Sequence, residues 1–201
     1  CENEPFDRRP ACLYRQCPKI DEGLDIMHMK ARSVYEFMRN VNLMDAVECL
    51  VGPEITCNPI QHLRAKGPVP YLGDQPHHSG LNVPWHQDAA VTWEEADPSN
   101  IVTCWIPLVD ATSENGCMRV IPGIKTRDYF EHEPGGNNTG PRIKPQLMPE
   151  RKPCIAECPK GGVIFMSKYT PHSSSDNMAD TVRWSLDLRY QPTGEPTGRP
   201  F

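Results

Sequence analysis

The sequence predicts a mainly β fold, a jelly-roll barrel with helices packed against it. After Gly52, six short segments have strand-like patterns and are separated by loops rich in proline and glycine. The chain has 22 prolines in 201 residues, and they concentrate in those loops. Because the strands follow a helical start and do not alternate with helices, an antiparallel sandwich or barrel is favoured over a parallel α/β sheet. The expected strands are 55–66, 84–91, 101–108, 117–121, 162–167 and 182–190.

Two helices are expected ahead of the first strand. Apolar residues fall at helical spacing from Val34 to Met38, and Asn42 is the expected N-cap of a second helix that ends at Gly52. Since each helix has one apolar stripe, we expect both to pack against a flat surface such as a sheet. The stripe of the second helix consists of Leu43, Ala46, Val47, Leu50 and Val51.

We expect residues 1–201 to form one domain, with a helical layer over about 24–52 and the barrel over about 55–190. A chain of this length buries a core without disulfides or structural metals. The first thirty residues have no clear period. The chain begins at Cys1 and stops at Phe201, which leaves open that it is a fragment without its native termini.

The composition favours a small-molecule partner. The chain has 21 basic and 26 acidic side chains, a formal net charge of -5 and no long basic run, so nothing provides the positive surface that nucleic acid requires. No stretch approaches the roughly 18 apolar residues of a membrane span, and no signal peptide is recognisable. Nine scattered cysteines without a CxxC pair are typical of reduced intracellular thiols. We expect a soluble cytoplasmic protein; organelle targeting and the oligomeric state are left open.

Three residues predict a metal centre. His86 and Asp88 lie two apart in an expected strand, so both side chains can face one point, although such a pair is more often only hydrogen-bonded. His172 follows a buried-strand run, 161–167, from which it could reach the pair across the barrel. Two imidazoles and one carboxylate leave three positions open on an octahedral ion. A non-haem Fe(II) centre needs those positions for a bidentate keto acid and O2.

The last expected strand predicts a carboxylate-binding arginine. Alternation places Arg183, Ser185, Asp187 and Arg189 on one face, which we expect to line the barrel interior. A guanidinium holds a carboxylate through two parallel hydrogen bonds, as the distal carboxylate of 2-oxoglutarate requires. A structural ion pair between Arg183 and Asp187 or another acid is the alternative.

Four stretches resemble the phytanoyl-CoA dioxygenase family of Fe(II)/2-oxoglutarate oxygenases. They are Trp85-His86-Gln87-Asp88, the run Glu114 to Gly123, the run Gly161 to Phe165 with Thr170 to Ser174, and Arg183. Together with the helix that ends in Val47-Glu48-Cys49 and the turn Gly52-Pro53-Glu54-Ile55, they span roughly residues 43 to 190. The resemblance implies a double-stranded β-helix, the cupin-like form of the jelly roll, with helices outside the larger sheet.

The resemblance also implies roles for individual residues. The metal ligands would be His86, Asp88 and His172, with Fe(II) as the metal and 2-oxoglutarate and O2 as co-substrates. Arg183 and Ser174 would hold the distal carboxylate of 2-oxoglutarate. Further positions near 2-oxoglutarate would be Gln87 and Trp105. In the strand before the His86 motif, Lys66 aligns with a lysine of the family and His62 with a pocket-facing position, assigned to cofactor binding, with Gln61 in place of His62 if the register slips by one residue.

The substrate is not predicted. Members of the family act on diverse small molecules, and the dispersed basic residues without a phosphate-binding loop disfavour a CoA thioester. We expect the substrate walls in segments 67–83 and 125–152. Candidate substrate contacts are Trp93, Tyr71, His77 and His78.

The expected reaction is hydroxylation of a small molecule with release of succinate and CO2. Each ligating histidine should donate its second ring nitrogen to a carbonyl, side chain or water. Alternatives are an oxoglutarate-independent cupin-type metalloenzyme, a catalytically idle binding domain on the same fold, and a halogenase. Halogenation is disfavoured because Asp88 fills the coordination position that a halide would need.

Overall fold

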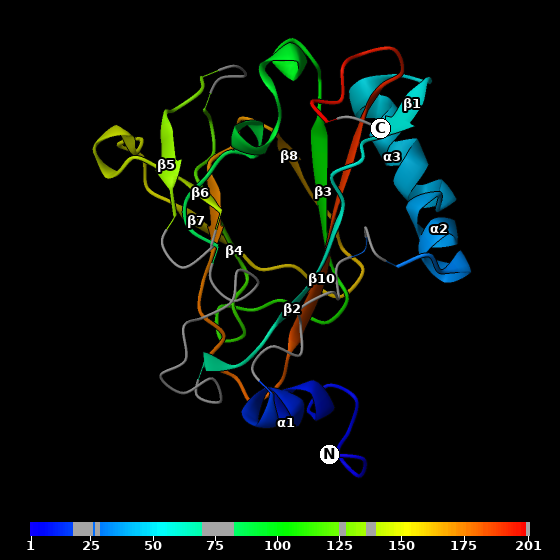
Figure 1. The fold of residues 1–201 in the computed structure, drawn as a ribbon, viewed down its shortest axis with the longest axis vertical. Coiled ribbons are helices and arrows are strands. Elements are labelled where there is room, and N and C mark those ends of the chain that lie inside the picture. Colours follow the sequence, from blue (N-terminus) through cyan, green and yellow to red (C-terminus); the bar gives the residue numbers. More distant parts are fainter. Residues whose placement is uncertain (18–25, 27–28, 70–82, 125–127, 136–139, 200–201) are drawn as a thin grey trace.

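The computed structural model describes residues 1–17, 26, 29–69, 83–124, 128–135 and 140–199. In these ranges the fold is the predicted double-stranded β-helix, in which two antiparallel sheets face each other (Figure 1). The larger sheet contains β1 (Ile55–Cys57), β2 (His62–Lys66), β3 (Val102–Pro107), β8 (Ile164–Ser167) and β10 (Arg183–Pro192). The smaller sheet contains β4 (Met118–Val120), β7 (Cys154–Ala156) and β9 (His172–Ser174).

Strand β10 lies at the centre of the larger sheet, between β3 on one side and β1 and β2 on the other. Its sequence alternates between polar and apolar residues, and nearly all of them are buried. Leu186, Leu188 and Tyr190 point outward into the main core cluster. The polar residues point to the space between the two sheets, as the alternation predicts.

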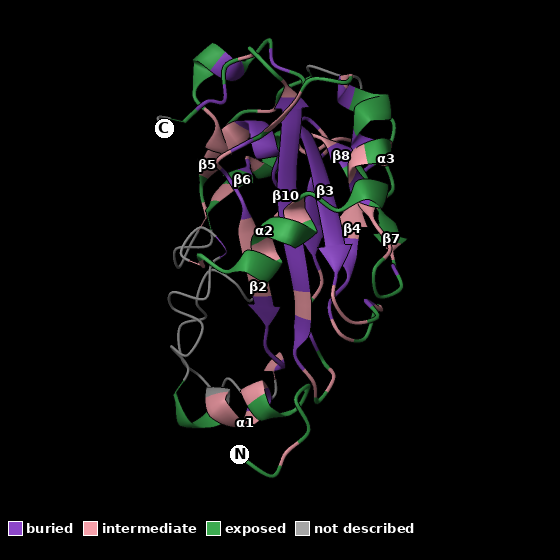
Figure 2. Cartoon of the chain, turned by 90° about the vertical axis from the view of Figure 1, so that its right-hand side faces the viewer, coloured by how far each residue is buried: buried purple, intermediate pink, exposed green. Residues whose placement is uncertain are grey.

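Helices α2 (Arg32–Met38) and α3 (Val41–Val51) cover the outer face of the larger sheet (Figure 2). Leu43, Val47 and Val51 of α3 pack on β3 and β10, and burying each such side chain contributes about 1.5–3 kcal/mol. A third helix, α1 (Arg9–Gln16), packs Ala11 against the start of β10. No apolar period had marked α1. None of the helices among the described residues is long and apolar enough to cross a membrane.

Several predicted boundaries are wrong. Residues 84–91 are not a strand, because only His86 makes an isolated bridge and Asp88–Val91 form a 3-10 helix. The expected strand 55–66 is two strands separated by residues 58–61. Four strands of three residues each were not expected, since three residues show no alternation. Besides β7 and β9 they are β5 (His132–Pro134) and β6 (Pro141–Ile143), which pair as a hairpin.

The N-cap of α3 is Asn40, not Asn42. Asn40 Oδ1 accepts hydrogen bonds from the N–H groups of Asn42 at 3.0 Å and Leu43 at 3.4 Å. The helix begins at Val41, so Asn42 is its second residue and its side chain is exposed. The apolar stripe predicted which face of the helix is buried, but it did not predict the residue at which the helix begins.

We predict that Asn40→Ala lowers the free energy of unfolding by about 1 kcal/mol, because two helix N–H groups lose their acceptor. The matched control, Asn42→Ala, should change it by less than about 0.5 kcal/mol. Urea unfolding followed by circular dichroism measures both. A larger loss for Asn42→Ala than for Asn40→Ala would contradict the assignment of the cap.

Candidate functional site

His86, Asp88 and His172 meet in the space between the sheets. One possible ligand atom of each lies within 4.8 Å of the others, and all three residues are buried. Asp88 Oδ1 is 3.8 Å from His86 Nε2 and 3.9 Å from His172 Nε2. The sequence-predicted set therefore converges at one point, and two imidazole nitrogens and a carboxylate suit a divalent first-row transition metal.

The two histidines lie side by side, because His86 forms an isolated antiparallel bridge with His172 of β9. His86 and His172 exchange backbone hydrogen bonds of 3.0 Å and 2.9 Å, which places both rings on one face with centroids 4.2 Å apart. The expectation that His172 reaches the pair across the barrel is therefore wrong. Asp88 joins them because the chain turns into a 3-10 helix after Gln87.

Backbone carbonyls fix the tautomer of both histidines. His86 Nδ1 lies 2.9 Å from the carbonyl of Pro84, and His172 Nδ1 lies 2.9 Å from the carbonyl of Thr170. Because a carbonyl only accepts, each Nδ1 is the donor and each Nε2 keeps its lone pair for a metal. Burial lowers the pKa of His86 to about 3, so this ring is neutral at physiological pH.

Asp88 is ionised and held by two donors. Arg189 Nη2 donates to Oδ1 at 2.6 Å, and Thr103 Oγ1 donates to Oδ2 at 2.5 Å. Burial alone would raise the pKa of Asp88, but Arg189 and the two histidines together lower it well below its usual value. The carboxylate therefore carries its charge without a metal.

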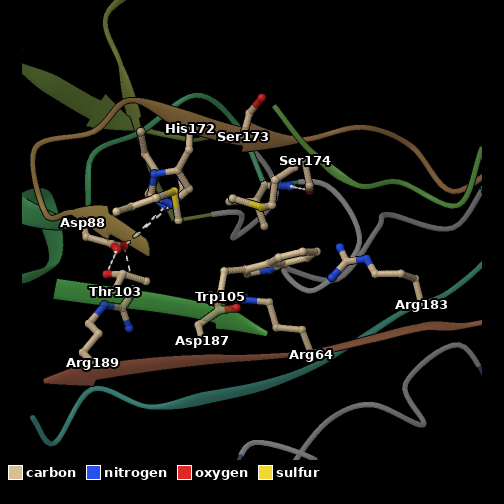
Figure 3. Close-up of a pocket in the computed structure, with 14 residues that line it drawn as sticks. Arg64, Asp88, Thr103, Trp105, His172, Ser173, Ser174, Arg183, Asp187 and Arg189 are labelled. Carbon is tan, nitrogen blue, oxygen red and sulfur yellow. Dashed lines mark hydrogen bonds and ion pairs between the residues drawn. The ribbon is translucent and has the colours of Figure 1, made fainter. Parts of the chain in front are cut away.

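These residues open into one cavity (Figure 3). Asp88 and His172 lie on one side of Trp105 in this view, and Arg183 lies on the other. The guanidinium of Arg183 is 5.2 Å from the centre of the Trp105 ring. The lining residues are Arg64, Val83, His86, Asp88, Thr103, Trp105, Met118, Met166, His172, Ser173, Ser174, Arg183, Asp187 and Arg189.

Arg183 differs from the other two arginines of the cavity. Arg64 pairs with Asp187 at 2.5 Å, and Arg189 pairs with Asp88. Arg183 is 2% exposed and donates from Nη1 to Ser185 Oγ at 2.6 Å, but its Nε has no partner and it forms no ion pair with the described part of the chain. The alternative of an Arg183–Asp187 pair is therefore wrong. Burial lowers the pKa of Arg183 to about 10, which still leaves it protonated at neutral pH.

Ser174 lies on the same side of the cavity as Arg183 in Figure 3. Its Oγ accepts from Lys66 Nζ at 2.8 Å, and Lys66 is the cross-strand partner of Arg183. Burial and the nearby Arg183 lower the pKa of Lys66 to about 7. Gly116, at φ +84°, packs so closely that a Cβ there would lie 2.7 Å from Lys66 Cε. A glycine is therefore required where the Asn115-Gly116 turn packs against Lys66.

Gln87 does not face the cavity, contrary to its expected role near 2-oxoglutarate. Its Nε2 donates to the carbonyls of Asp128 and Tyr169, each at 2.7 Å, and its Oε1 accepts from the Phe130 N–H at 2.8 Å. The neighbours of Gln87 in sequence both face the cavity, so its own side chain points the other way. It joins the segments that carry His86 and His172 to the loop before β5.

The other described residues that the sequence suggested for the site do not line the cavity. His62 lies beside Asp187 on the inner face of the larger sheet but does not line the cavity. Gln61, its alternative, bonds the backbone of Arg189. Trp93 is 49% exposed and does not line the cavity either. Tyr71, His77 and His78 lie outside the described residues.

Several lining residues were not predicted as site residues from the sequence, among them Thr103, Met118 and Met166. Thr103 lies two residues before Trp105 in β3, so strand alternation could have identified it. Met118 and Met166 also line the cavity. Both methionines pack in the core cluster around Trp105, and their apolar character gave no signal of a second role.

The family profile described as phytanoyl-CoA dioxygenase matches residues 20–185, most of the chain. The chain belongs to this family. Over 144 residues it is 28% identical to phytanoyl-CoA dioxygenase domain-containing protein 1 of Bos taurus. This match covers 62% of this chain and 49% of the bovine protein. It is 25% identical over 116 residues to a 2-aminoethylphosphonate dioxygenase of an uncultured bacterium, covering 58% and 42%.

The chain spans about half the length of the curated relatives it matches. Among solved structures, the non-haem monooxygenase ThoJ superposes with a TM-score of 0.67 at 20% identity and covers 95% of this chain and 72% of ThoJ. The epimerase SnoN, solved with Fe3+, α-ketoglutarate and nogalamycin RO, gives a TM-score of 0.64 at 20% identity, with 87% and 66% covered. At such identities these likenesses establish the fold.

We predict that His172→Ala weakens metal binding at least about 100-fold, since changes to residues that only support a ligand already cost 10–100-fold. Titration of the apo protein with Co(II), followed by visible absorption, measures this. Asp88→Ala is less informative, because it leaves Arg189 buried without its partner and should cost about 3–5 kcal/mol of stability.

The control for this prediction is His62→Ala, which removes a histidine that does not line the cavity. Its affinity for Co(II) should equal that of the wild type. If His172→Ala binds Co(II) as tightly as the wild type, the metal ligands are wrongly assigned.

Proposed function

We propose that this chain is an Fe(II)- and 2-oxoglutarate-dependent dioxygenase that hydroxylates a small molecule and releases succinate and CO2. The observation that carries the proposal is that a metal-ligand set and a buried arginine without an ion pair open into one cavity. Membership of the phytanoyl-CoA dioxygenase family supports it. The relative that binds both Fe3+ and α-ketoglutarate has the same fold.

His86, Asp88 and His172 would hold the iron. Their donor atoms are preorganised, because the imidazoles are fixed by carbonyls and the carboxylate by Arg189 and Thr103. Bound Fe(II) supplies the activation of O2 that couples decarboxylation of 2-oxoglutarate to oxidation of the substrate. The protein positions the reactants and excludes water, which the burial of all three ligands favours.

Arg183 would bind the distal carboxylate of 2-oxoglutarate, with Ser174 as a second donor. A buried guanidinium with an unpartnered N–H is costly unless an anion completes its hydrogen bonds. Arg64 and Arg189 are committed to Asp187 and Asp88, so Arg183 is the cavity arginine left for a ligand. Trp105 between the two ends would pack against the carbon chain of 2-oxoglutarate.

Hydroxylation is favoured over halogenation because Asp88 is present and firmly bonded. A halide would have to displace a carboxylate held at both oxygens. A cupin-type enzyme that does not use 2-oxoglutarate would leave Arg183 without a role, and an idle binding domain would give no metal-dependent turnover. Release of succinate in the presence of Fe(II), 2-oxoglutarate and candidate small molecules separates these functions.

We propose a small molecule as the substrate, and its chemical class is open. The matched relatives carry names as different as phytanoyl-CoA dioxygenase and 2-aminoethylphosphonate dioxygenase. Two expected substrate walls, 67–83 and 125–152, lie partly outside the described residues. A screen for succinate release should therefore include acyl-CoA thioesters, phosphonates and polycyclic metabolites.

We predict that Arg183→Met weakens 2-oxoglutarate binding more than about 100-fold, because loss of a buried charge pair costs about 3–5 kcal/mol. Metal affinity should remain close to that of the wild type, since Arg183 forms no hydrogen bond with His86, Asp88 or His172. Calorimetric titration of 2-oxoglutarate into Mn(II)-loaded protein measures the first quantity.

The control arginine is Arg142, whose ion pair with Glu133 lies on the surface of the β5–β6 hairpin. Arg142→Met should leave 2-oxoglutarate binding unchanged. Equal affinity for 2-oxoglutarate in Arg183→Met and wild type would exclude Arg183 as the carboxylate-binding residue.

A further inference from the structure

Arg189 contacts the carboxylate oxygen of Asp88 that faces both histidines. Its Nη2 lies 2.6 Å from Oδ1, the atom that is 3.8 Å and 3.9 Å from the two histidine Nε2 atoms. Thr103 holds the other oxygen, Oδ2, at 2.5 Å. Donors from β10 and β3 thus hold both oxygens of the ligating carboxylate.

The segment 58–61, between β1 and β2, fixes Arg189 in turn. Arg189 Nη1 donates to the Ile60 carbonyl at 3.1 Å, and its backbone N–H donates to Gln61 Oε1 at 3.1 Å. The Arg189 carbonyl accepts from Gln61 Nε2 at 2.9 Å and from the Asn58 N–H at 2.9 Å. Because Arg189 is only 3% exposed and bonded on its main chain and side chain, its guanidinium has little freedom.

We propose that Arg189 is a positioning residue for the metal, which holds Asp88 so that one oxygen faces the cation. The inference rests on the proposed function, since it takes Asp88 as a ligand. Oδ1 has more than one lone pair, so it can accept from Arg189 and still bind a metal. With Thr103 on Oδ2, Asp88 occupies a single coordination position. A second position taken by Asp88 would compete with 2-oxoglutarate and O2.

The charge and the position of Arg189 have opposite effects on metal affinity. A guanidinium close to a divalent cation repels it, so charge alone predicts tighter metal binding when Arg189 is replaced by a neutral residue. Positioning predicts weaker binding, because Asp88 loses the donor that orients it. The direction of the change therefore distinguishes the two effects.

The test is Co(II) titration of apo Arg189→Met, Arg189→Lys and wild-type protein, with thermal unfolding measured in parallel. We expect Arg189→Met to weaken Co(II) binding about tenfold or more, as for other residues that orient a metal ligand. Arg189→Lys keeps the charge but cannot bond both the Ile60 carbonyl and Asp88 as the guanidinium does, and it should weaken Co(II) binding less than Arg189→Met. Unchanged or tighter Co(II) binding by Arg189→Met overturns the proposal.

Lys168→Met is the matched control for loss of a buried cation. Lys168 is 1% exposed, and its Nζ donates to the carbonyls of Ala96 and Asp97, outside the cavity lining. This variant should lose stability but bind Co(II) like the wild type. If Arg189→Met does not fold, Arg189→Lys decides, and unchanged affinity in that variant overturns the proposal. Failure of the wild type to bind Co(II) would instead refute the metal site and the proposed function with it.

Discussion

Burial of charge on the inner face of β10 constrains the rest of the barrel. The outer face of this strand packs under α3, so its inner face must accommodate two arginines and an aspartate away from water. A buried ion without a partner costs several kcal/mol, roughly the scale of a domain's net stability. Asp187 is therefore paired with Arg64 from β2, and Arg189 with Asp88 from the metal-binding segment. Arg183 has no ion pair with the described residues, and we propose that the carboxylate of 2-oxoglutarate is its partner.

The ion pair between Arg189 and Asp88 links the two sheets at the proposed metal site. His172 belongs to the smaller sheet and His86 pairs with it through an isolated bridge, whereas Arg189 and Thr103, which hold Asp88, belong to the larger sheet. Gln87 fixes the smaller-sheet side by bonding the backbone at 128, 130 and 169. The geometry of the ligands thus depends on contacts among strands far apart in sequence. Each proposed ligand side chain is thereby hydrogen-bonded by other parts of the chain.

The sequence was sufficient for those parts of the site that depend on alternation and residue chemistry. Alternation in β10 identified the inner-face residues, and the two histidines and the aspartate named from the sequence do converge into a group that could hold a metal ion. It was insufficient where local geometry departs from a regular strand. Asp88 begins a 3-10 helix where the sequence predicted a strand that continues to residue 91. The side-by-side pairing of His86 and His172 depends on a single long-range bridge, which no local pattern encodes.

The proposed function requires that the metal and 2-oxoglutarate bind together in one cavity. The most direct measurement is an anaerobic titration of Fe(II)-loaded protein with 2-oxoglutarate, followed by visible absorption. A keto acid that chelates Fe(II) produces a weak charge-transfer band, and we predict that this band appears and saturates at one equivalent of 2-oxoglutarate. If the protein binds Fe(II) at the three ligands but gives no band with excess 2-oxoglutarate, the central claim is contradicted.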